Sequence, residues 1–269
     1  MELFGYIAAI MIGVSLGMIG GGGSILTVPA LVYLMGTAPV EATAYSLFIV
    51  GSTSMVGGFQ KYMQGFVDVK NAIIFGIPSI IGVFVTRKFI VPTIPDHIGV
   101  VMGSDITKDI LIMLLFAILM VLASLSMIRS GKQSETTKKS EVAASASTRY
   151  FLIVLEGLIV GSITGFVGAG GGFLIIPALV LLTGLPMKQA IGTSLVIIAA
   201  KSLFGFLGDL GHMDMQWQLL GTFTALAIGG IFLGNKLSKN IEGHKLKSAF
   251  GWFVLVMGVY IIAREIMNA

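Results

Sequence analysis

The chain has 269 residues, of which 55% are apolar and only 11% are charged. A soluble domain carries about 25% charged residues, and the mean hydropathy of +0.96 is too high for a surface that faces water. These numbers exclude a soluble enzyme and predict an integral membrane protein with several spans. The chain has no cysteine, which excludes disulfides, thiolate catalysis and cysteine-ligated metals.

In chain order, ten apolar segments are expected, and they form two sets of five. They lie at about 3–19, 23–36, 41–60, 69–90 and 108–129, then at about 149–167, 171–184, 187–208, 214–237 and 246–266. The second segment of each set is roughly 21 Å of helix, which is too short to cross a bilayer alone. Each is therefore expected to form a glycine-broken or re-entrant pair with the segment before it, followed by three spanning helices.

The two sets are copies of each other. Residues 13–57 align with 161–205 at an offset of 148 without a gap, and 18 of the 45 pairs are identical. Internal repeats of this kind are typical of secondary transporters. We expect an all-α membrane protein with two homologous halves, 1–128 and 150–269. The polar, basic linker between them, 129–149, is expected to be disordered.

The lysine and arginine pattern predicts the orientation. The linker 129–149 carries five basic residues against two acids, and the loop 236–247 carries four lysines against one glutamate. The positive-inside rule places both in the cytoplasm. The loop 87–108 is nearly balanced in charge and is expected outside, together with the C-terminal 264–269. Equivalent loops would then lie on opposite sides, which favours inverted-topology repeats over the alternative of parallel halves.

Each half carries a glycine cluster at its first break, Gly20–Gly23 and Gly168–Gly172. Each glycine is about 1 kcal/mol less favourable than alanine in a helix, and backbone N–H groups freed at membrane depth need a partner. Helices that begin near Ser24 and at Gly172 would aim two positive dipole ends at one point, which suits an anion. The alternative is that these glycines only allow tight helix crossing. Neither cluster has the sequence of a nucleotide-binding loop.

Two charged residues lie inside expected spans. Lys201 is in the middle of its segment, where a lysine costs about 2.5–3.5 kcal/mol on insertion scales, and it shares a helical face with Ser194. It is expected to bind the anion or, alternatively, to pair with a buried acid such as Glu156. Glu156 could instead carry a coupling proton. Asp209 is interpreted as a solvated loop charge, with a gate as the alternative.

The predicted substrate-binding set combines both clusters, the hydroxyls of the following spans and the buried lysine. Its members are Gly20, Gly21, Gly22, Gly23, Ser24, Ser46, Thr53, Gly168, Gly170, Gly171, Gly172, Thr193, Ser194 and Lys201. Within this set, Gly22 and Gly170 are expected to tolerate no side chain. We expect no catalytic residue, cofactor or metal site, because no hydrolase or metalloprotease motif is present and the three histidines lie far apart.

The doubled motif resembles one family. The patterns G-x-x-G-G-G-G-S-x-x-x-x-P-A-L from Gly17 and G-x-x-G-x-G-G-G-F-x-x-x-P-A-L from Gly165, followed by A-x-G-T-S-L at 190–195, resemble the TauE/SafE sulfite exporters, also called the toluene-sulfonate uptake permease family. The resemblance implies a multi-pass transporter of the bacterial inner membrane. Its substrate would be a small sulfur-containing anion such as sulfite or an organosulfonate, exported or imported by alternating access. The first half departs from the pattern, since 42–47 reads A-T-A-Y-S-L.

A channel or facilitator for small anions is the alternative function. The expected partners are the anion and the lipid bilayer, and a homodimer is allowed for. The net charge of +4 is attributed to orientation in the membrane, so no nucleic acid is expected as a partner.

Overall fold

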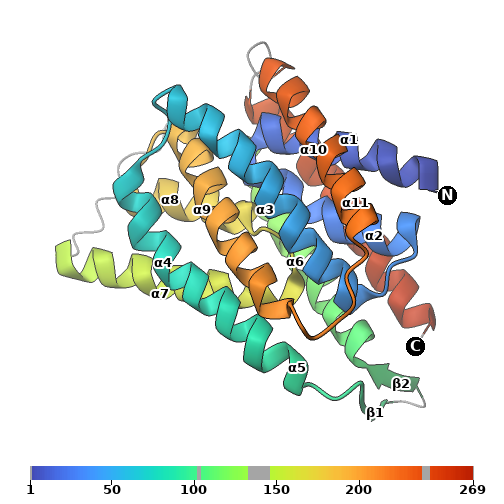
Figure 1. The fold of residues 1–269 in the computed structure, drawn as a ribbon. Coiled ribbons are helices and arrows are strands. Elements are labelled where there is room, and N and C mark those ends of the chain that lie inside the picture. Colours follow the sequence, from blue (N-terminus) through green and yellow to red (C-terminus); the bar gives the residue numbers. More distant parts are fainter. Residues whose placement is uncertain (1, 102–103, 133–145, 238–242, 269) are drawn as a thin grey trace.

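The computed structural model describes residues 2–101, 104–132, 146–237 and 243–268. The chain forms a bundle of helices (Figure 1). The first half contains α1 Glu2–Ile19, the 3-10 segment η1 Gly20–Leu26, α2 Thr27–Met35, α3 Pro39–Met63, α4 Val69–Val85, the π-helical turn η2 Thr86–Ile90, α5 Val91–Thr93 and α6 Lys108–Lys132. The second half contains α7 Ala146–Val167, α8 Gly172–Thr183, α9 Met187–Asp209, α10 Trp217–Leu237 and α11 Gly243–Asn268.

Each of the expected apolar segments contains a helix. Within the described ranges, six helical stretches are long and apolar enough to cross a bilayer: Leu3–Met35, Val69–Thr93, Lys108–Leu125, Tyr150–Val167, Met187–Asp209 and Trp217–Leu237. A helical bundle satisfies the backbone within each span, as the bilayer requires. In the described part of the chain, the sheet that departs from the all-α expectation is an antiparallel hairpin, β1 His97–Val101 with β2 Ser104–Thr107, at the lower end of the bundle in Figure 1.

The predicted linker 129–149 is partly helical. Helix α6 continues to Lys132, and α7 already begins at Ala146. The expectation of disorder was therefore wrong for both ends, where each helix runs past its last apolar residues. The central part of the linker, 133–145, lies outside the described residues.

Glycines bring two pairs of helices into backbone contact at equivalent crossings. A Cβ atom added to Gly13 of α1 would lie 1.9 Å from the carbonyl oxygen of Ala227 on α10. A Cβ atom added to Gly161 of α7 would lie 2.2 Å from the carbonyl oxygen of Ser79 on α4. Gly13 and Gly161 are 148 residues apart, and so are the contacted residues Ser79 and Ala227. The first helix of each half thus packs along the fourth helix of the other half.

Helices α3 and α9 pack together in the centre, and each holds the loop that follows the other. The Tyr45 hydroxyl on α3 donates to the Asp214 carbonyl oxygen at 3.3 Å and accepts from the Gln216 N–H at 3.1 Å. The Thr193 hydroxyl on α9 accepts from the Asp68 N–H at 2.9 Å. Tyr45 and Thr193 are also 148 residues apart, so the two halves fix their loops from equivalent positions.

Candidate functional site

The two glycine breaks have different backbones. In the first, the chain tightens into the 3-10 segment η1, and Gly20 has φ +75°. In the second, the chain leaves the helix between Gly168 and Gly171, which have φ +72° and +70°, and α8 begins at Gly172. The helix start predicted at Gly172 is confirmed. The start predicted near Ser24 is wrong by three residues, because the 3-10 turns carry the chain on to α2.

The structure brings the two breaks together. A Cβ atom added to Gly21 would lie 2.5 Å from the Cα of Gly172, and one added to Gly172 would lie 2.1 Å from the Cα of Gly21. A Cβ atom added to Gly170 would lie 3.1 Å from the Cβ of Ser24. Every residue of both clusters is buried. We call this meeting point, formed by residues 20–24 and 168–172, the glycine junction.

Lys201 lies against the glycine junction and is fully buried. Its Nζ donates a hydrogen bond of 2.6 Å to the Thr164 hydroxyl of α7. The same Nζ lies only 2.8 Å from the point that a Cβ atom at Gly171 would occupy. Gly171 is the N-cap of α8, so a positive ammonium group lies beside the positive end of a helix. Among the described residues, no carboxylate pairs with Lys201.

Some hydroxyls of the helices around the junction are buried without a hydrogen-bond partner. Ser46 and Thr53 on α3 are both fully buried, and their oxygens bond to none of the described residues. The same holds for Ser54 on α3 and Ser202 on α9. An unpaired buried hydroxyl is unfavourable in an apolar surrounding. These four side chains are therefore available to bind a polar ligand.

The other predicted hydroxyls already have partners within the protein. Ser24 and Ser194 each donate to the backbone carbonyl three residues earlier, at 2.7 and 2.8 Å. Thr193 accepts from the loop N–H of Asp68, as described above. Thr193 therefore fastens a loop in this structure, although the sequence pattern suggested substrate contact.

Glu156 does not pair with Lys201. It is half-buried on α7, eight residues before the Thr164 that Lys201 contacts, which corresponds to about 12 Å of helix. The structure does not bring these two predicted residues together, so the ion-pair interpretation of Lys201 is wrong here. The role of Glu156 as a coupling residue stays a prediction.

The structure contains a buried ion pair that was not predicted from the sequence. Arg87 of η2 is fully buried, and its Nη1 lies 3.5 Å from each carboxylate oxygen of Asp209 at the end of α9. Asp209 is buried too, so its interpretation as a solvated loop charge is wrong. Arg87 was assigned to a loop because it ends an apolar run, yet the helix continues to Thr93. Thr164 was also missed, because a threonine inside an apolar helix carries no distinctive signal.

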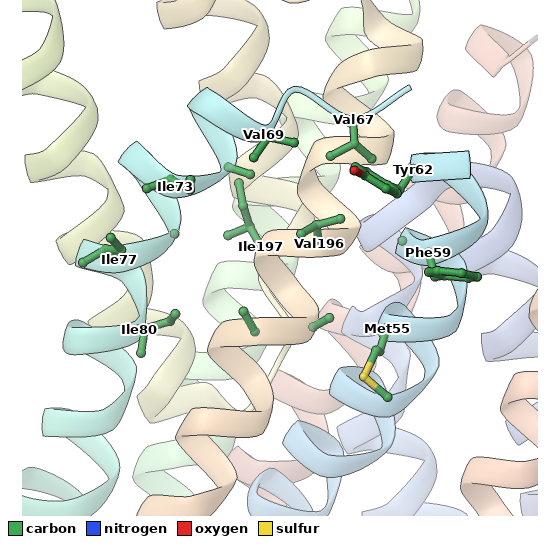
Figure 2. A pocket seen from close by; sticks show the side chains of 15 residues that line it. Met55, Phe59, Tyr62, Val67, Val69, Ile73, Ile77, Ile80, Val196 and Ile197 are labelled. Carbon is green, nitrogen blue, oxygen red and sulfur yellow. The ribbon is translucent and has the colours of Figure 1, made fainter. Parts of the chain in front are cut away.

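Two surface grooves lie apart from the junction. Figure 2 shows an apolar groove of about 510 Å³ between α3, α4 and α9, lined by side chains such as Phe59, Ile73 and Val196. No charged residue lines it, which matches a surface facing lipid. The second groove, of about 460 Å³, is polar; its lining is Ala38, Val40, Glu41, Asp96, His97, Thr107, Lys108, Asp109, His212 and Met213.

Comparison with known proteins identifies the family. The model of the family described as sulfite exporter TauE/SafE matches residues 6–261. The chain belongs to the TauE/SafE family. It is 29% identical to a probable membrane transporter protein of Xylella fastidiosa, over 95% of this chain and 92% of the relative. It is also 25% identical to the probable membrane transporter protein YdhB of Bacillus subtilis, over 94% of this chain and 96% of the relative.

A relative from an archaeon has a similar extent. The probable membrane transporter protein MJ0441 of Methanocaldococcus jannaschii is 23% identical, over 95% of this chain and 93% of the relative. No solved structure matches the chain. This TauE/SafE protein is a multi-pass membrane transporter, and its relatives' names describe transport rather than catalysis.

Proposed function

We propose that this TauE/SafE protein is a secondary transporter that carries a small sulfur-containing anion, sulfite or an organosulfonate, through the glycine junction by alternating access. The membrane would be the inner membrane of a bacterial-type cell, with the linker 129–149 on the cytoplasmic side. The observation that carries the proposal is the position of Lys201. Among the residues that the structure describes, the partner of this buried ammonium group beside the N-terminus of α8 is a neutral hydroxyl, that of Thr164.

The charge balance of the junction calls for an anion. A buried cation without a counter-charge is strongly unfavourable, and the positive end of α8 adds to the positive potential. An anion would accept a hydrogen bond from Lys201 Nζ in place of the Thr164 hydroxyl. Its other oxygens would accept from the first N–H groups of α8, which have no acceptor within the helix.

The chemistry of sulfite and sulfonates fits these donors. Their sulfur carries three oxygens that point in different directions, so one head group can accept from Lys201, from α8 and from a free hydroxyl of α3. Ser46 and Thr53 supply such hydroxyls. Beside them, Val50 and Ile198 lie within 3 Å of a Cβ atom added to Gly170, so a small apolar substituent would also find apolar neighbours.

Alternating access is supported by burial and by the repeat. All residues of the junction are buried, which corresponds to an occluded state. The equivalent crossings of α1 with α10 and of α7 with α4 link the two halves through close backbone contacts. In inverted-repeat transporters, one bundle rocks against the other around a central site. We infer that these two crossings are the surfaces on which the halves move.

The test is flux into liposomes that contain the purified protein, with labelled sulfite, sulfate and an organosulfonate as probes. Lys201→Met removes the charge and keeps a long side chain, so we expect flux to be lost while the protein still folds. Lys188→Met is the matched control, because Lys188 lies exposed at the start of the same helix. Equal flux in wild type and Lys201→Met would refute the proposed site. Single-channel conductance would identify a channel instead of a transporter.

A further inference from the structure

We propose that Arg87 forms a second anion site, which binds oxyanions through the Nε and Nη2 edge of its guanidinium group. A role of this site in transport rests on the function proposed above. Its ability to bind an oxyanion rests on the geometry of Arg87 alone. The ligand class is an oxyanion with two oxygens on one side, such as a carboxylate, sulfite or sulfonate.

The guanidinium group of Arg87 is only partly used within the protein. Its Nη1 is 3.5 Å from both oxygens of Asp209, whereas a charge-assisted hydrogen bond measures about 2.7–2.9 Å. Nε and Nη2 are buried and bond to none of the described residues. These two nitrogens share one edge of the planar group, and that edge matches a pair of oxyanion oxygens. Arg87 therefore holds two parallel donors for which the described residues supply no acceptor.

At the corresponding level of the other half, a different pair of side chains links the helices. The residue 148 positions after Arg87 is Asn235, whose amide donates to the Gln60 side chain. That amide pair joins α10 to α3, whereas Arg87 and Asp209 join η2 to α9. A buried ion pair is a weak source of stability compared with neutral contacts. The charges on one side are thus better explained by a ligand than by the joining of two helices.

The backbone around Arg87 also departs from a regular helix. Arg87 lies in the π-helical turn η2, and such turns inside α-helices occur often at functional sites. Opposite it, Gly208 lets α9 approach closely, since a Cβ atom there would lie 3.0 Å from the Cβ of Arg87. A larger residue at position 208 would push the two helices apart.

The pair lies between the junction and the polar groove along α9. Lys201 precedes Asp209 by eight residues, about 12 Å of helix. His212, which lines the polar groove, follows Asp209, and its N–H donates to the Asp209 carbonyl oxygen at 3.1 Å. An anion that moves between the groove and Lys201 would pass this level. Asp209 would balance the charge of Arg87 before the anion arrives and repel the anion afterwards, so that it can leave.

The test measures anion binding to the full chain in detergent by calorimetry, with sulfite, sulfate and acetate as probes. It uses the Lys201→Met background, which disables the junction, and the wild type. The key variant is Arg87→Gln with Asp209→Asn, which replaces the ion pair by two neutral amides and should keep the melting temperature, because a buried ion pair adds little net stability. We expect its residual oxyanion affinity to fall about tenfold or more, because a bidentate charged contact is lost.

Asp209→Asn alone should change the oxyanion affinity in the opposite direction. Removal of the repelling carboxylate should strengthen oxyanion binding, by about threefold or more for a neighbouring like charge. A structural ion pair predicts instead that Asp209→Asn lowers the melting temperature, that the double replacement restores it, and that anion affinity never changes. That second pattern, or no oxyanion binding in the Lys201→Met background, would overturn the Arg87 site.

The two proposals can fail separately. If wild type transports a sulfur anion and Lys201→Met does not, while the double variant keeps its affinity, the Arg87 site is refuted and the proposed function stands. If no sulfur anion is transported, but the double variant still loses affinity for acetate or sulfate, the proposed function is refuted and the Arg87 site stands.

Discussion

Gly21 and Gly172 lie backbone against backbone where the two glycine breaks meet, and neither position has room for a Cβ atom. The added atom would lie 2.5 Å from Gly172 in one direction and 2.1 Å from Gly21 in the other. Atoms of a rigid backbone cannot yield as the end of a side chain can. The contact therefore decides how closely the two halves approach each other at the junction.

The first prediction compares Gly21→Ala with Gly22→Ala. Overpacking against backbone costs about 1–3 kcal/mol, so Gly21→Ala should lower the melting temperature and abolish transport. At Gly22 the nearest atoms are the Ile19 Cγ2 at 3.1 Å and the flexible end of Met127 at 3.9 Å. Gly22→Ala should therefore keep both properties near wild type. If both variants lost the same amount of stability and transport, the backbone contact between Gly21 and Gly172 would not be what limits substitution at the junction.

This comparison also marks what the sequence could and could not predict. The doubled cluster located both breaks, because consecutive glycines disfavour a regular helix wherever they occur. The sequence predicted that Gly22 and Gly170 alike tolerate no side chain, because the two residues match in the alignment of the halves. The structure distinguishes them: a Cβ atom added to Gly170 would lie 2.5 Å from Val50, whereas one added to Gly22 would lie 3.1 Å from the Ile19 side chain, which needs to shift by only a few tenths of an ångström. Which glycine meets which neighbour depends on the packing of the other half, which no local pattern encodes.

Among the charged residues, too, some positions could be predicted from the sequence and others could not. Each apolar segment marked by hydropathy contains a helix, since a bilayer allows few other structures, and Lys201 was correctly marked as a buried exception. Hydropathy could not mark Arg87, because a charge at the end of an apolar run is usually a loop charge. The π-helical turn that carries the helix past Arg87 leaves no trace in the apolar pattern. The partners of both cations, Thr164 and Asp209, come from distant parts of the chain.

The second prediction concerns Thr164, whose hydroxyl is the acceptor for Lys201 Nζ at 2.6 Å. Thr164→Val keeps the shape and removes that acceptor, which leaves the ammonium group unpaired. The anion-free protein should lose about 1–3 kcal/mol of stability. Because a bound anion would pair the same ammonium group, added sulfite should raise the melting temperature more in Thr164→Val than in wild type. Thr164→Ser, which retains the hydroxyl, is the control.

The third prediction is that Lys201 and Glu156 act independently. Lys201 bonds to Thr164, and Glu156 lies about 12 Å further along α7. Changes at sites this far apart add to within about 0.5 kcal/mol. The free energy of unfolding of Lys201→Met with Glu156→Gln should therefore equal the sum of the single effects. Recovery of stability in the double variant would mean that the two residues form an ion pair in the membrane.

The fourth prediction concerns topology, which the lysine distribution supports and which determines whether the halves are inverted. Pro95 precedes the hairpin β1–β2, and Lys236 lies exposed at the end of α10. Because the chain has no cysteine, Pro95→Cys and Lys236→Cys each introduce a single thiol. In intact cells, an impermeant maleimide should label position 95 and leave position 236 unlabelled until the membrane is permeabilised. Labelling of both from the same side would mean that the repeats are parallel, and the two glycine breaks would then approach the junction from one side of the membrane.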